Sequence, residues 1–147
     1  MRLISNRGNI DIWNPDLENT QEYIQTAINQ GYEVKIDLWT KDNKLYLGTN
    51  EPTQPLDFDW FERNNGRLWI QCRTIDVMAQ FNKLDSRGSN LHYFWHELNK
   101  ISLTSRGYLW CESDEVVPGG IMYQPKEDND LTEAYGICSD SILKYKK

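Results

Sequence analysis

The segment SNRG at residues 5–8 closes a short apolar run, and it is followed by ENT at 18–20 and by KID at 35–37. The runs Arg2–Asn6 and Tyr32–Trp39 have the length and composition of buried strands. Between them, Asn19 is placed to cap a helix, with Glu22 three residues on as in a capping box. Gly31 is placed to end that helix. This order predicts two parallel strands joined by a right-handed crossover.

Short apolar runs continue along the chain, so that eight strands are expected in all. The other six are expected at Lys44–Gly48, Arg67–Cys72, His92–His96, Tyr108–Cys111, Gly120–Gln124 and Tyr135–Cys138. Further helices are expected at Asp59–Asn64, Ile75–Leu84 and Ser139–Lys147. Strands alternating with helices favour an α/β fold with a parallel sheet. The 147 residues fall short of the roughly 250 typical of a (β/α)8 barrel, which leaves a stripped barrel or an open α/β sheet. Of the two, we expect a reduced (β/α)8 TIM-type barrel that lacks several outer helices.

Length and composition limit the classes of protein to consider. One domain covering residues 1–147 is expected. The formal net charge of -6 argues against general nucleic-acid binding, which favours basic faces. No apolar run is long enough for a membrane span, and the start MRLISNRG lacks a signal-peptide core. Three widely spaced cysteines favour reduced thiols. A cytoplasmic protein without a cofactor is therefore expected.

The motifs, in their order and spacing, resemble the glycerophosphodiester phosphodiesterase and phosphatidylinositol phospholipase C superfamily. That family opens with His-Arg-Gly on the first strand, Glu-Asn-Thr at the first helix and Glu-x-Asp on the second strand. Later segments that resemble its strand ends are LGTN at 47–50, WIQCR at 69–73 and GICSD at 136–140. The resemblance covers the chain from the first strand to the end, and it implies a barrel of the phosphodiesterase type.

The same resemblance implies that the family's chemistry has been lost. The family uses two histidines as acid and base, and the matching residues here are Asn6 and Thr49, which do not exchange protons near pH 7. Its three acidic metal ligands correspond to Lys35, Asp37 and Gln71. One carboxylate beside an ammonium cannot hold a divalent cation that requires several oxygens. We therefore expect no bound metal and no hydrolysis.

Positive charge would then replace the metal. Arg7, Lys35 and Arg73 are expected to converge at the carboxyl ends of the strands and to hold a phosphate group. Alternatively, Lys35 pairs with Asp37 in a structural ion pair, and the sequence leaves both interpretations open. Neutral hydrogen bonds to the ligand are expected from Asn6, Thr49, Asn50 and Gln71. The aromatic residues expected to stack on a base or sugar are Trp39, Trp95, Trp110 and Tyr123.

Three functions remain open at this point. The first is binding, or sequestration, of a small phosphodiester or nucleotide-like ligand without hydrolysis. The second is a residual metal-independent phosphodiesterase, for which His96 is the candidate base; the alternative for His96 is a hydrogen-bonded histidine without a catalytic partner. The third is a protein-interaction scaffold with a vestigial pocket, which would show a large exposed apolar patch. The missing helices also favour a homodimer.

Overall fold

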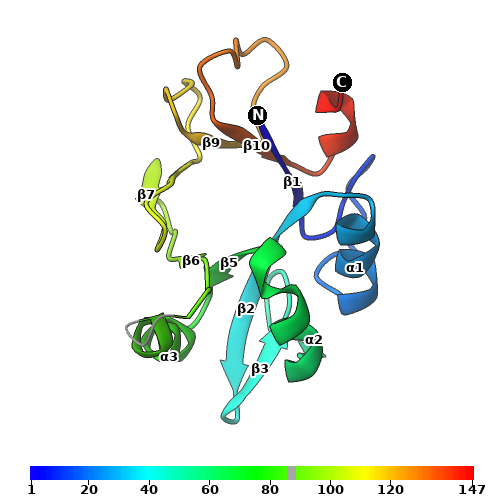
Figure 1. Cartoon of the computed structure of the whole chain (residues 1–147), viewed down its shortest axis with the longest axis vertical. Coiled ribbons are helices and arrows are strands. Elements are labelled where there is room, and N and C mark those ends of the chain that lie inside the picture. The colour runs from blue at the N-terminus through cyan, green and yellow to red at the C-terminus, as the bar shows by residue number, and fades with distance from the viewer. Residues whose placement is uncertain (86–88) are drawn as a thin grey trace.

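The computed structural model describes residues 1–85 and 89–147. Its centre is a strongly curled mixed sheet whose strands stand around a ring (Figure 1). Among the described residues, three α-helices accompany the sheet, and they lie outside the ring. None of the helices in these two ranges has the length and apolar composition needed to cross a membrane.

The elements follow one another along the chain with short connections. The strands are β1 (Arg2–Asn6), β2 (Glu33–Lys41), β3 (Lys44–Leu47), β4 (Gln54–Pro55), β5 (Leu68–Cys72), β6 (Tyr93–Phe94), β7 (Ile101–Leu103), β8 (Leu109–Cys111), β9 (Ile121–Tyr123) and β10 (Gly136–Ser139). The helices are α1 (Gln21–Asn29), α2 (Phe58–Asn64) and α3 (Ile75–Asp85), with 3-10 turns η1 (Asn65–Arg67) and η2 (Ile142–Tyr145). The eight expected strands are present, with shifted ends, while β4 and β7 were not expected.

Seven strands run parallel in the order β6-β5-β2-β1-β10-β9-β8. At one end β7 pairs antiparallel with β8, and the β3–β4 hairpin extends the second half of β2. The register sets Asn6 beside Lys35, and Asp37 beside Gln71. Because the seven strands share one direction, their carboxyl ends meet at one rim of the curl, where sites of such sheets are found.

The sheet is not a closed TIM barrel. Along the curl the terminal strands are β6 and β7, while the β3–β4 hairpin branches from β2, and the described residues form no ladder between β6 and β7. A hydrogen bond from the Ser105 N–H to the Tyr93 carbonyl, 2.8 Å long, connects the two ends locally. Since β7 runs against β8, it does not continue the parallel order. The expectation of an α/β fold with few helices is confirmed, but closure into a (β/α)8 barrel is not.

Two helix predictions are corrected by local geometry. Thr20, and not Asn19, caps α1, because its hydroxyl accepts the Tyr23 N–H at 3.4 Å. Asn19 has a left-handed φ of 56°, which turns its side chain toward β2 instead. Gly31, at φ 95°, follows the end of α1 as expected. The predicted helix at Ser139–Lys147 is wrong beyond the 3-10 turn η2, since its first residue still belongs to β10.

Strand alternation divides the concave side of the curl into layers. A middle layer of apolar side chains from six strands packs together: Ile4, Trp69, Phe94, Trp110, Ile121 and Cys138. Arg2 and Glu33 lie toward the amino ends of the strands, and Lys35 and Asp37 lie toward the carboxyl ends. A second, larger core fills the space between the convex side and the three helices. The middle layer therefore separates two polar ends of the same sheet.

Candidate functional site

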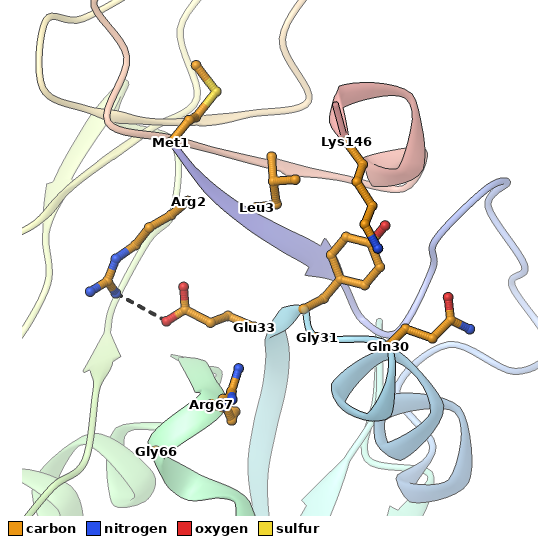
Figure 2. A pocket seen from close by; sticks show the side chains of 10 residues that line it. Met1, Arg2, Leu3, Gln30, Gly31, Glu33, Gly66, Arg67 and Lys146 are labelled. Carbon is orange, nitrogen blue, oxygen red and sulfur yellow. Dashed lines mark hydrogen bonds and ion pairs between the residues drawn. The ribbon is translucent and has the colours of Figure 1, made fainter.

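A cavity of about 430 Å³ opens at the carboxyl ends of the parallel strands. Its charged and polar lining comes from Arg7, Lys35, Gln71, Arg73, His96, Glu97 and Glu112. Its aromatic lining comes from Trp39, Trp95 and Tyr123. A wider hollow of about 650 Å³ lies at the opposite, amino-terminal end (Figure 2). We take the smaller cavity as the candidate site, because the chemically active residues of parallel α/β sheets collect at the carboxyl ends.

One buried carboxylate organises the cationic wall of this cavity. Asp37 is fully buried and accepts from Arg7 Nε at 2.7 Å, Lys35 Nζ at 2.9 Å and Arg73 Nη1 at 2.9 Å. The Asn19 amide adds a fourth hydrogen bond, 3.0 Å long. The three predicted phosphate-binding cations therefore do converge, and they do so around the acid with which Lys35 was alternatively expected to pair.

The backbone explains how these side chains meet. Lys35 and Asp37 are two residues apart on β2 and so share one face. Arg7 follows β1 in a left-handed conformation, φ 60°, and its N–H donates to the Lys35 carbonyl at 2.7 Å. Gly8, with φ 94°, then passes so close to α1 that an added Cβ would lie 2.7 Å from Tyr23 Cδ2. Arg73 is fixed at the end of β5 by its N–H, which donates to Leu38 on β2.

Burial and charge act differently on the two members of the Lys35–Asp37 pair. Burial alone would raise the pKa of Asp37, but the charges of Lys35 and Arg7 outweigh it and hold that pKa well below its ordinary value. Burial lowers the pKa of Lys35, and the attraction of Asp37 does not fully compensate because Arg7 repels the ammonium. Asp37 is thus firmly ionised, whereas Lys35 is a costly buried cation that shares its one carboxylate with two arginines.

Several polar groups around the cavity keep unused hydrogen-bonding capacity. Lys35 has three N–H donors and Arg73 has five, and within the described residues each makes one hydrogen bond from its side chain, to Asp37. The buried Asn6 Oδ1 has no hydrogen-bond donor among the described residues, although its Nδ2 donates to Asp140 at 2.8 Å. Buried polar atoms without a partner are rare in folded proteins. Asn6 does not itself line the cavity, so the groups that a bound ligand could reach are the donors of Lys35 and Arg73.

The opposite wall carries a histidine whose two ring nitrogens are both engaged. His96 Nε2 lies 2.9 Å from Glu112 Oε2, and Nδ1 lies 2.7 Å from Ser102 Oγ. Burial lowers the pKa of His96, with Lys35 acting in the same direction and Glu112 against it. Sequence reasoning missed Glu112 and Ser102. The signal for Glu112 was its position directly after the predicted strand Tyr108–Cys111, at the rim where parallel strands end.

The aromatic candidates divide between cavity and core. Trp39, Trp95 and Tyr123 line the cavity, and the Arg73 guanidinium lies 4.9 Å from the centre of the Trp39 ring. Trp110 is fully buried in the middle layer, 4.7 Å from the Phe94 ring, and does not line the cavity. Stacking on a ligand is therefore available to the first three aromatic residues and not to Trp110.

Four other residues expected at the site lie outside the cavity lining: Asn6, Asp37, Thr49 and Asn50. Thr49 contacts the residues that hold Arg7 and Asp37. Its hydroxyl donates to Glu18 at 2.8 Å and accepts from Asn19 at 3.1 Å. Glu18 in turn lies 3.6 Å from Arg7 Nη1. Asn50 is exposed and does not line the cavity. Thr49 therefore orients the residues that hold Arg7, without facing the cavity itself.

No family model, curated protein or solved structure matches this chain. Within the described ranges, no group of three or more His, Cys, Asp or Glu side chains is arranged to hold a metal ion. The chemistry of the site must therefore be argued from its own residues.

The ion pairs that join Asp37 to Arg7, Lys35 and Arg73 predict unequal effects of two substitutions on stability. Asp37→Asn should lower the free energy of unfolding by about 3–5 kcal/mol, because it leaves a buried ammonium without its carboxylate. Lys35→Met should change it by no more than about 1 kcal/mol, because Asp37 keeps both arginines and a buried charge is removed. Urea unfolding at neutral pH measures both values. Equal losses in the two variants would contradict this account.

The depressed pKa of Asp37 also determines the direction in which the free energy of unfolding changes with pH. Its stabilising contribution is complete above the unfolded-state pKa of about 3.9 and is lost as the pH falls below it. The unfolding free energy of the unmodified protein should therefore fall more steeply below pH 4 or so than that of Asp37→Asn. Parallel acid dependences of the two proteins would mean that Asp37 is not stabilised by its cations.

Proposed function

We propose that the chain binds a small phosphodiester or nucleotide-like ligand in this cavity without hydrolysing it. The observation that carries the proposal is the convergence of Arg7, Lys35 and Arg73 on one cavity wall. On this proposal, the curled sheet is a reduced relative of the phosphodiesterase barrel, in which fixed cations stand where a metal would be. Sequestration of such a ligand would be the corresponding role.

The charges of the wall suit a monoanion. On the cationic side, Arg7, Lys35 and Arg73 face two carboxylates, Asp37 and Glu18, so that side retains one positive charge. The two carboxylates of the cavity lining itself, Glu97 and Glu112, would disfavour a more highly charged anion. A phosphodiester carries one negative charge and would neutralise it. Arginine presents a planar fork to two phosphate oxygens, and the buried Asp37 already holds both guanidinium groups in place. Little side-chain ordering would remain to oppose binding.

The rest of the cavity suits the substituents of a phosphodiester. Trp39, Trp95 and Tyr123 offer aromatic faces for a base or sugar. Glu112 lines the far wall, where it favours hydrogen-bond donors and disfavours a second phosphate. Gln71 also lines the cavity and offers an uncharged amide for hydrogen bonds to a ligand hydroxyl. The ligand would thus lie with its phosphate on the β1–β2–β5 side.

Hydrolysis is disfavoured because His96, the histidine in the cavity lining, is hydrogen-bonded to its neighbours on both sides of its ring. Both nitrogens of His96 are occupied by Ser102 and Glu112, so neither is free to take a proton from a ligand. Asn6 and Thr49 do not exchange protons at neutral pH. General acid–base catalysis typically contributes about 10²–10⁴-fold to a rate, and on this proposal none of these three residues supplies it.

Binding can be tested by calorimetry with cyclic nucleotides, dinucleotides and glycerophosphodiesters. Arg7→Ala and Arg73→Ala should each weaken the tightest ligand by about 1.5–3 kcal/mol, the range for hydrogen bonds to charged groups. Arg63→Ala, at an exposed arginine on α2, is the matched control and should leave the affinity unchanged. If no compound binds, or if the three variants behave alike, the binding proposal fails and an interaction scaffold becomes the better account.

Turnover can be tested with an activated diester, bis(4-nitrophenyl) phosphate, in the presence and absence of a chelator. We expect no release of nitrophenol above the uncatalysed rate in either condition, because both ring nitrogens of His96 are engaged by Ser102 and Glu112. Turnover that persists with chelator and disappears in His96→Ala would instead support a metal-independent phosphodiesterase.

A further inference from the structure

The amino-terminal end of the curled sheet has a second basin. The hollow of about 650 Å³ adjoins another of about 320 Å³, and the two share Arg2, Glu33 and Gly66 in their linings. Figure 2 shows the larger hollow with Arg2 and Glu33 on one side, Lys146 on the other and Arg67 below. The smaller hollow continues past Arg2 toward the turn before β8. We call the two hollows together the amino-terminal basin.

Positive charge gathers in this basin although the chain carries a net charge of -6. Its linings contain Arg2, Arg67, Arg106 and Lys146, against a single described carboxylate, Glu33. Four cations against one acid leave three positive charges. The opposite cavity, by contrast, has its cations largely neutralised by acids. The basin is therefore the more strongly cationic of the two ends.

Arg2 has a structural role that the other three cations lack. Its Nη1 lies 3.1 Å from Glu33 Oε1, and its guanidinium lies 5.0 Å from the Tyr108 ring centre and 5.9 Å from that of Trp69. Glu33 Oε1 also accepts from the Trp69 indole N–H at 3.3 Å, so this one oxygen holds both groups. The Arg2–Glu33 pair thus covers the middle aromatic layer and forms the floor of the basin.

The remaining three cations are not neutralised by the protein. Arg67, Arg106 and Lys146 are exposed, and none of them makes an ion pair with a described carboxylate. Arg67 and Lys146 line the larger hollow, while Arg106 lines the smaller one. Like charges around one concave surface repel each other, and a bound anion would relieve that repulsion.

Two uncharged groups in the linings add to the capacity for an anionic ligand. The Tyr32 hydroxyl is buried and has no hydrogen-bond partner within the described residues. His92 lines the smaller hollow, and burial together with the charges of Arg106 and Arg2 lowers its pKa to about 4. His92 is therefore neutral at physiological pH and offers hydrogen bonds without adding charge.

We propose that the amino-terminal basin binds a small polyanion carrying two or more phosphate groups. The cations are distributed over two adjoining hollows, with Arg106 in one and Arg67 and Lys146 in the other. A chain or ring of phosphates can contact several of them at once. Arginine and lysine are the side chains that bind phosphate oxygens most strongly.

This site is independent of the proposed phosphodiester cavity. The middle layer of apolar side chains lies between the two ends of the sheet, and the residues that line the basin do not line the cavity. The two sites also differ in charge, since the cavity suits a monoanion and the basin suits a polyanion. Failure of one proposal therefore leaves the other standing.

Calorimetric titration with inorganic tripolyphosphate tests the basin directly, in low-salt buffer without divalent cations. We expect tripolyphosphate to bind at least about tenfold more tightly than orthophosphate, since several cations act together. Arg67→Ala, Arg106→Ala and Lys146→Ala should each reduce the affinity by about two- to fivefold, as expected for exposed charges. Combining all three should remove detectable binding, and added salt should weaken binding by the unmodified protein.

Matched controls separate the basin from general charge effects and from the other site. Arg63→Ala and Lys44→Ala remove exposed cations elsewhere and should leave tripolyphosphate affinity unchanged. Arg7→Ala alters the phosphodiester cavity and should also have no effect. The proposal is overturned if tripolyphosphate does not bind, if the control variants weaken it as much as the basin variants, or if only Arg7→Ala removes it.

Discussion

The buried carboxylate of Asp37 is the interaction on which the rest of the site depends. It joins strands β1, β2 and β5 through Arg7, Lys35 and Arg73, and Asn19 ties it to the start of α1. A buried acid with three cationic partners remains ionised, and each partner is held in one orientation. The cationic wall of the cavity is therefore assembled by folding, before any ligand arrives. Burying these charges has an electrostatic cost, which falls mainly on Lys35. The attraction of Asp37 only partly offsets the loss of water around the Lys35 ammonium.

The curled sheet gives this small protein two chemically different ends. The apolar middle layer keeps the amino-terminal basin apart from the carboxyl-terminal cavity, and it also supplies the packing of the concave side. In the carboxyl-terminal cavity the acidic side chains nearly balance the cations, whereas in the amino-terminal basin the cations are in excess. An open curl with few helices leaves both rims exposed, so each end can carry its own ligand. This arrangement follows from the parallel order of seven strands.

Strand alternation and the order of the motifs were enough to predict the cationic wall of the cavity from the sequence. Lys35 and Asp37 share a face of one predicted strand, and Arg7 and Arg73 follow the ends of two others, so their convergence could be foreseen. The partners of His96 could not, because Ser102 lies on the unexpected antiparallel strand β7 and its pairing depends on contacts distant in sequence. The cap of α1 was misplaced for a similar reason: Asn19 is held by Asp37, a tertiary contact that overrides its local capping preference. The sheet stays open at β7, which runs antiparallel to β8 and was not among the expected strands.

The most direct measurement of the central claim is carbon-13 NMR of the Asp37 side-chain carboxyl as a function of pH. The account predicts that its chemical shift stays that of a carboxylate through the region near pH 3.9 or so, where an ordinary aspartate titrates, for as long as the protein remains folded. A titration of Asp37 centred close to that ordinary value would contradict the account. It would mean that the three cations do not hold this carboxylate ionised, and that the wall of the cavity is not preassembled.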